Sequence, residues 1–194
     1  ASHNPIDYNG MKIVGRGSKP LSDHKFEFIK DLAEERNFSK PQQMGQILNK
    51  KKVARAAYIE KVLGFVDCKN LKPLKMVINS GNGAAGPTVD AINKRLTEKG
   101  VKTNFVFVHH DPNPMFPNGI PNPMLNENRS STADAVVTEK AKFGVAFDGD
   151  FDRCFFFDQL GNFIPSEYVV GLLAEIFLNK EKGATIIHDP RVIW

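Results

Sequence analysis

The sequence lacks closely spaced cysteines, a long apolar run and a strong excess of charge of one sign. Only two cysteines, Cys68 and Cys154, occur in 194 residues, whereas a cysteine-based metal site needs a pair or a cluster at short spacing. We interpret both as reduced thiols, with Cys154 in a buried strand, as expected in a reducing compartment. The best candidate for a membrane span, residues 168–178, is too short and is interrupted by Glu175, and no signal peptide opens the chain. These absences predict a soluble cytoplasmic protein with no membrane partner.

The charge balance is only mildly basic. Lysine and arginine number 26 against 22 acidic residues, which gives a net charge of +4, and the one basic run covers residues 50–52. A nucleic-acid-binding protein usually concentrates its basic surplus on one face, so we expect no nucleic-acid partner. The sequence begins without a methionine and stops just beyond an apolar stretch, and we expect both ends to be cut from a longer protein.

Loops and two helices are expected in the first third of the chain. A short apolar stretch at residues 11–14 predicts a strand between two loops. Capping residues and apolar spacing predict a helix over residues 22–32 and a second one over residues 47–63. A polar linker at residues 37–45 separates the two helices.

Strands and helices alternate from residue 69 onward. The predicted strands cover residues 74–78, 105–108, 144–147, 154–157 and 185–187, and helical patterns cover residues 87–99, 125–140 and 166–178. This alternation predicts an α/β fold with mixed, largely parallel sheets and helices on both faces. Residues 111–123 contain five prolines, which cannot donate backbone hydrogen bonds, so they should form an irregular loop.

A glycine-rich turn at residues 81–86 matches the pattern G-x-G-x-x-G between a predicted strand and a predicted helix. Such a turn can bind a dinucleotide, but that fingerprint also needs an acidic residue about 20 residues further on. Val106 stands at that position, in mid-strand, and the nearest acid is Asp111. We therefore predict a tight turn, in which glycine permits unusual backbone angles and close packing, and no dinucleotide site.

Three aspartates at alternate positions, Asp148, Asp150 and Asp152, directly follow the predicted strand 144–147. Unpaired carboxylates this close would repel one another, whereas a hard cation such as Mg²⁺ prefers oxygen ligands. Three carboxylates should converge on one point only if the loop curls after Asp148, and Gly149 should make that curl easy.

Other interpretations of the aspartates are weaker. An EF-hand loop needs Gly and Glu where this chain has Arg153 and Gln159. A phosphatase with Asp148 as nucleophile and Asp150 as acid would leave Asp152 without a role. A solvated acidic turn between two strands remains possible on these residues alone.

The N-terminal segment, residues 1–12, combines a small hydroxyl, an imidazole and an amine in Ser2, His3 and Lys12. A serine beside a histidine can act as a nucleophile, and histidine or lysine can move protons. Its Asn-Pro and Asn-Gly pairs are also ordinary turn formers, so on these residues alone a surface turn is the better explanation.

Together these motifs resemble the α-D-phosphohexomutase family, and most closely its bacterial phosphomannomutases. Residues 1–12 are similar to the family's phosphoserine loop, and residues 148–153 are similar to its metal loop. Residues 79–86 and 117–123 resemble two further segments of the same family. The two catalytic motifs occur together, in this order and separated by an α/β unit, which makes the resemblance specific.

The resemblance implies roles for individual residues. Ser2 would be the phosphorylated serine, and it would complete an Mg²⁺ site with the three aspartates through a phosphoryl oxygen. His3 and Lys12 would transfer protons or contact phosphate, and Arg153 would lie beside the phosphoserine. Arg191 would be a substrate-binding residue, since the family often has a basic residue at this position.

The resemblance also implies four domains in the complete protein. Residues 1–50 would be the end of the first domain, residues 51–158 the whole second domain, and residues 159–194 the start of the third. The implied reaction interconverts mannose 6-phosphate and mannose 1-phosphate through a hexose 1,6-bisphosphate, and the 194 residues alone should lack turnover. Glucose phosphates as substrates, a non-catalytic scaffold and a nucleotide-binding oxidoreductase are the alternatives. The choice of sugar and the oligomeric state do not follow from these residues.

Overall fold

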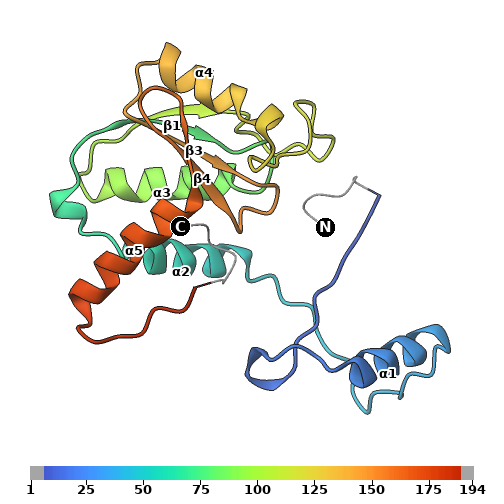
Figure 1. Cartoon of the computed structure of the whole chain (residues 1–194). Coiled ribbons are helices and arrows are strands. Elements are labelled where there is room, and N and C mark those ends of the chain that lie inside the picture. Colours follow the sequence, from blue (N-terminus) through green and yellow to red (C-terminus); the bar gives the residue numbers. More distant parts are fainter. Residues whose placement is uncertain (1–6, 189–194) are drawn as a thin grey trace.

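The computed structural model describes residues 7–188 and places a compact α/β unit beside more extended segments (Figure 1). Its strands are β1 (Lys75–Asn79), β2 (Asn104–Val108), β3 (Phe143–Phe147), β4 (Cys154–Phe157) and β5 (Phe163–Ile164). Its α-helices are α1 (Asp23–Glu34), α2 (Lys51–Leu63), α3 (Gly86–Glu98), α4 (Ser130–Thr138) and α5 (Ser166–Lys180). Three short 3₁₀ helices, η1 (Arg16–Ser18), η2 (Cys68–Asn70) and η3 (Asn126–Asn128), complete the elements.

The five strands form one mixed sheet in the order β2-β1-β3-β4-β5. β1 pairs in parallel with β2 and β3, so that Val77 lies opposite both Val106 and Gly144. β4 and β5 add antiparallel pairs through a hairpin. The predicted α/β class with a mixed sheet is confirmed, and its parallel half is the part built from strand-helix-strand units.

Helices cover both faces of this sheet, as predicted (Figure 1). On one face α4 packs over β1 and β3, and a buried cluster joins Val77, Val136 and Phe157. On the other face α3 lies against the sheet with α2 outside it, where Ile59, Leu63 and Leu96 are buried together. Along β2, Val106 and Val108 pack against the first cluster and Phe105 against the second, as the period of two in a strand requires.

Two predicted strands are not present in the described part of the chain. Residues 11–14 contribute only an isolated bridge between Val14 and Pro20, and residues 185–187 have no regular structure. A strand is stable only when a neighbour accepts its hydrogen bonds, and no described strand lies beside either segment. Apolar composition alone did not reveal whether a pairing partner lies within residues 7–188.

Two smaller expectations also differ from the structure, and a third is confirmed. The second helix begins at Lys51 rather than near residue 47, and Ile47 is fully exposed. Cys154 is exposed rather than buried, because successive side chains of β4 point to opposite faces and only Phe155 and Phe157 are buried. The proline-rich residues 111–123 contain no regular element, as predicted.

Helices α1 and α5 contain no buried residue. Apolar side chains of α5, including Leu172, Leu173 and Phe177, are about half exposed. Within residues 7–188, therefore, the apolar sides of these two helices are at most partly covered. No helix in this part of the chain is long and apolar enough to cross a membrane.

Candidate metal centre

Three of the sequence motifs meet at one edge of the sheet. The parallel strands β1, β2 and β3 end at the same edge, because their registers align Asn79 with Val108 and Ala146. The glycine-rich turn follows β1, the proline-rich loop follows β2, and the aspartates follow β3. The edge outside the carboxyl ends of parallel strands is where α/β proteins bind ligands.

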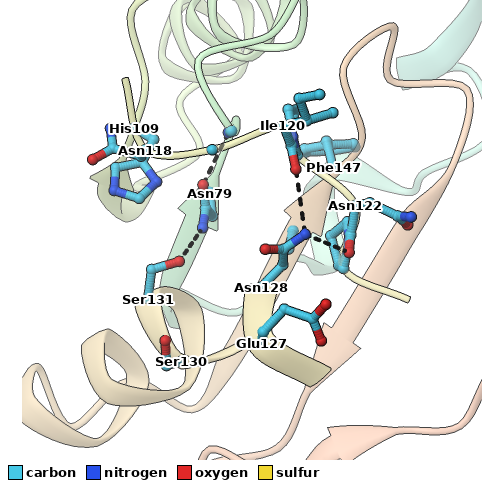
Figure 2. Close-up of a pocket in the computed structure, with 15 residues that line it drawn as sticks. Asn79, His109, Asn118, Ile120, Asn122, Glu127, Asn128, Ser130, Ser131 and Phe147 are labelled. Carbon is cyan, nitrogen blue, oxygen red and sulfur yellow. Dashed lines mark hydrogen bonds between the residues drawn. The ribbon is translucent and has the colours of Figure 1, made fainter. Parts of the chain in front are cut away.

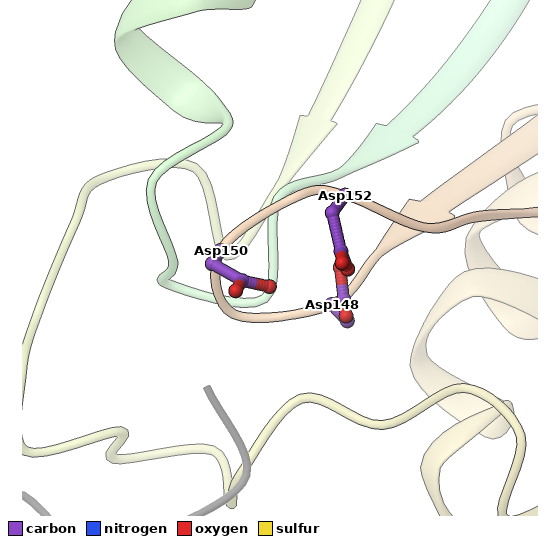
Figure 3. Close-up of side chains that lie close together, drawn as sticks. All are labelled: Asp148, Asp150 and Asp152. Carbon is purple, nitrogen blue, oxygen red and sulfur yellow. The ribbon is translucent and has the colours of Figure 1, made fainter. Parts of the chain in front are cut away.

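The three aspartates lie close together, as predicted (Figure 3). Asp148, Asp150 and Asp152 each offer a carboxylate oxygen, and these oxygens all lie within 4.8 Å of one another. Asp148 has no solvent-exposed surface, whereas Asp150 and Asp152 are exposed. The cluster is therefore open on one side and anchored in the protein on the other.

The curl of this loop contains a left-handed residue that the sequence did not indicate. The left-handed backbone conformation falls on Phe151, with a φ of 48°, rather than on Gly149. The Phe151 amide donates a 3.1 Å hydrogen bond to the Asp148 carbonyl, and the Phe151 ring meets the edge of Phe147 at 6.5 Å. This turn and ring contact fold the chain back, so that Asp152 returns toward Asp148.

Arg153 fixes the buried aspartate. Its Nε and Nη2 donate to Asp148 Oδ2 at 2.8 and 2.7 Å, and its backbone amide donates to Asp148 Oδ1 at 3.2 Å. Nε also lies 3.3 Å from Asp152 Oδ1. A buried carboxylate is costly unless it is paired, and Arg153 supplies that pairing.

The electrostatics of the cluster favour a cation. Burial raises the pKa of the Asp148 carboxyl above its ordinary value. A hydrogen bond with Asp148, together with Arg153, lowers the pKa of Asp152. Carboxylates this close together carry an excess of negative charge, and a bound cation would offset it.

The donor set fits a hard divalent cation. All three donors are carboxylate oxygens, the type that Mg²⁺ and Ca²⁺ prefer, and the set contains no nitrogen or sulfur ligand. Two exposed carboxylates leave room for water or for an anionic oxygen to complete the coordination. These side chains alone therefore support the interpretation as a metal centre.

The glycine-rich turn packs directly against the aspartate loop. The Ala84 amide donates a 2.9 Å hydrogen bond to the Gly149 carbonyl, and Gly83 and Gly86 are closely approached by the backbone of Gly149 and His110. Protein atoms thus occupy the space beside two of the glycines. The absence of a dinucleotide site stays a prediction, and this packing gives a physical reason for it.

A hydrogen-bonded Ser-His-Asp series, which the sequence analysis did not identify, stands behind this turn. Ser80 Oγ lies 3.4 Å from His110 Nδ1, and His110 Nε2 lies 2.9 Å from Asp90 Oδ1. Ser80 is completely buried, so it is not an open nucleophile. The series instead ties the ends of β1 and β2 to α3.

A polar cavity of about 310 Å³ lies at the same edge, between the start of α4 and the proline-rich loop (Figure 2). Asn79, which is nearly buried, donates to Ser131 and Thr132, and Asn128 donates to the carbonyls of Ile120 and Asn122. Asn128 therefore holds the proline-rich loop, whereas Asn79 ties the end of β1 to α4. A polar residue at a strand end, such as Asn79, was the sequence signal that could have indicated this role.

The remaining candidate residues are placed only in part. Ser2, His3 and Arg191 lie outside the described residues. Lys12 is exposed and forms no hydrogen bond or ion pair with any of residues 7–188. The structure therefore brings together the aspartates and Arg153 from the predicted set.

Comparison with known proteins agrees with this geometry. The family described as phosphoglucomutase/phosphomannomutase, alpha/beta/alpha domain II, matches residues 56–161, which is more than half of the chain. The chain is 51% identical over 195 aligned positions to a protein of Salmonella typhimurium named phosphomannomutase, and 52% identical to one of Vibrio cholerae. The alignments cover 100% of this chain but 43% and 42% of the relatives. The chain thus spans less than half the length of the curated relatives it matches.

A solved structure shows the same fold. The crystal structure of a phosphoglucomutase/phosphomannomutase family protein from Burkholderia thailandensis superposes with a TM-score of 0.77 at 32% identity. The superposition covers 94% of this chain and 37% of that one. Sequence profile, relatives and fold agree, and the chain belongs to the phosphoglucomutase/phosphomannomutase family.

Proposed function

We propose that this chain is part of a phosphomannomutase, which interconverts mannose 6-phosphate and mannose 1-phosphate. The single observation that carries the proposal is the convergence of three carboxylates, with ligand oxygens within 4.8 Å, in a chain of this family. The relatives named phosphomannomutase, at about half identity over the whole chain, support the choice of sugar. A phosphoglucomutase is the second candidate, because the family description names both activities.

The aspartate loop would hold Mg²⁺ through Asp148, Asp150 and Asp152. The cation supplies positive charge that stabilises phosphoryl oxygens, and phosphoryl transfer depends mainly on positioning and such stabilisation. Asp148 anchors the loop from its buried position, and Arg153 both neutralises Asp148 and presents a guanidinium beside the cluster. Guanidinium groups suit phosphate, since their donors match its oxygens.

Ser2 would carry the phosphoryl group and donate one of its oxygens to the metal site. It would pass the group to the free hydroxyl of a hexose phosphate, and the bisphosphate formed would return its other phosphoryl group to Ser2. His3 and Lys12 would move the proton of the hydroxyl or contact phosphate, and Arg191 would bind substrate. A phosphoserine carries about −1.5 to −2 charges at neutral pH, which the cation and these basic groups would offset.

The chain would contain one whole domain and parts of two others, with boundaries after residues 50 and 158. The 194 residues alone should show no mutase turnover, because positioning supplies much of the rate and the relatives have more than twice this length. A coupled assay with mannose 1-phosphate, run on this chain and on a full-length relative, measures the difference. Turnover by the 194 residues would mean that the substrate site lies within them.

Replacing Asp150 with asparagine should weaken Mg²⁺ binding by at least about tenfold, since even the loss of an outer-shell partner costs about 10- to 100-fold in metal affinity. The change removes a charge and almost no volume from an exposed side chain, so the fold should persist. Isothermal titration calorimetry of the 194-residue chain with Mg²⁺ measures the affinity.

Asp134→Asn is the matched control, because Asp134 is also exposed but lies on α4, outside the cluster. It should bind Mg²⁺ as the wild type does. Equal affinities of wild type and Asp150→Asn would show that the aspartate loop is a solvated turn, and the proposed function would lose its support.

A further inference from the structure

The glycine-rich turn at residues 81–86 contacts the aspartate loop through backbone atoms, and the proposed phosphoryl transfer gives the turn no role. We propose that this turn positions the metal-binding loop, and that Gly83 is the residue on which the positioning depends. The inference rests on the proposed function in one respect, namely that the aspartates bind Mg²⁺. Figure 3 shows the segment from β1 to α3 running beside the loop that carries the aspartates.

The contact between turn and loop is made by backbone atoms. The Ala84 amide donates to the Gly149 carbonyl at 2.9 Å. A Cβ on Gly83 would lie 2.5 Å from the Gly149 oxygen and 3.0 Å from its carbonyl carbon and Cα. A side-chain rotation cannot relieve such an overlap, so a methyl group at Gly83 must move either the turn or the loop.

Hydrogen bonds hold the turn in place from several directions. Gly83 donates to the Ser80 carbonyl at 2.8 Å, and Ser80 donates to the Val108 carbonyl at 3.1 Å. Asn79 Oδ1 accepts a 2.9 Å hydrogen bond from the Gly81 amide, and Ser80 itself is completely buried. Displacing the turn would break bonds to the ends of β1 and β2.

Asn82 fixes the turn to the proline-rich loop as well. Its side chain donates to the Asp111 carbonyl at 2.9 Å and accepts from Asn118 Nδ2 at 2.8 Å. Its amide donates to the His109 carbonyl at 2.7 Å, and its carbonyl accepts from the Asn113 amide at 2.8 Å. Asn82 has a φ of 55°, a conformation that asparagine tolerates better than most residues.

The aspartate loop is the more yielding of the two partners. Asp150 and Asp152 are exposed, and only Asp148 is anchored by burial and by Arg153. An overlap at Gly83 should therefore push Gly149 outward and carry Asp150 with it, while Asp148 stays in place. The oxygens that now lie within 4.8 Å would separate, and the ligand set would lose its geometry.

Gly83→Ala should consequently lower the affinity for Mg²⁺ by about tenfold or more, as outer-shell changes do. The backbone of Gly83 lies outside the left-handed region, so alanine is compatible with its φ and the methyl contact is the change that matters. Gly171→Ala on α5 is the control, because a Cβ there meets nothing within 4 Å. Calorimetric titration of the 194-residue chain with Mg²⁺ compares wild type with both variants, and circular dichroism checks their folds.

The outcomes separate the two proposals. Wild-type affinity in Gly83→Ala, beside weakened binding in Asp150→Asn, overturns the positioning role and leaves the proposed function intact. No Mg²⁺ binding by the wild type overturns both. If Gly83→Ala does not fold, a ¹⁵N NMR titration of the wild type with Mg²⁺ decides. The chemical shift of the Ala84 amide should change with the same midpoint as the calorimetric titration, while that of the Gly171 amide stays unchanged. An Ala84 amide that does not move on saturation with Mg²⁺ contradicts the inference.

Discussion

Replacing Phe157 with alanine should lower the free energy of unfolding of the α/β unit by about 3–5 kcal/mol, the usual cost of removing a buried phenylalanine. Phe157 has no exposed surface and lies in the cluster on the α4 face of the sheet. Its ring meets the edge of Phe163 at 5.7 Å, and it pairs with Gly144 on β3. A larger residue at position 144 could not fill the space, because a Cβ there would already lie 2.6 Å from Val136 Cγ2.

Urea denaturation followed by circular dichroism measures this loss. Phe28→Ala is the matched control, since Phe28 is 58% exposed on α1 and exposed substitutions usually change stability by less than about 0.5 kcal/mol. A similar small effect for both variants would show that β4 and β5 do not share the core of the parallel strands.

Elements that depend on local sequence were predictable. The strands at residues 75–79 and 143–147 are short apolar runs bounded by turn residues, and Pro87 marks the first turn of α3. The proline-rich loop was predictable for the same reason, because proline excludes regular structure within a few residues of itself.

Elements that depend on a distant partner were not predictable. Residues 185–187 have the composition of a strand, yet in the described part of the chain they remain unpaired. The exposure of Cys154 follows from which face of β4 the sheet buries, and a run of four apolar letters does not reveal that face.

The closeness of the three aspartates was predictable from the sequence, but the contacts that support their loop were not. Asp148, Asp150 and Asp152 stand out because alternate carboxylates after a strand are costly without a cation. Phe151 gives no sequence signal of a left-handed conformation, since bulky residues rarely adopt one. The contact between Gly83 and Gly149 joins two segments far apart in the chain, and only the fold brings their backbones together.

Arg153→Met should destabilise the metal-free chain by about 3 kcal/mol, the lower end of the cost of breaking a buried ion pair. The variant keeps an apolar stem but removes the two hydrogen bonds that Asp148, which has no exposed surface, accepts from the Arg153 side chain. The lower end applies because the Arg153 side chain is 40% exposed and solvent already screens part of the pair. Mg²⁺ should then stabilise the variant more than the wild type, since a cation among the aspartates replaces the missing charge.

Urea denaturation with and without Mg²⁺, at ionic strength matched with NaCl, separates specific binding from screening. Arg95→Met is the control, because Arg95 is 39% exposed, like Arg153, but its partner Glu60 is 52% exposed rather than buried. An exposed pair contributes little to stability, so Arg95→Met should be mild and insensitive to Mg²⁺. If the gap between Arg153→Met and wild type is the same at saturating Mg²⁺ as in its absence, the cation does not offset the charge of Asp148, and the ligand set must exclude the buried aspartate.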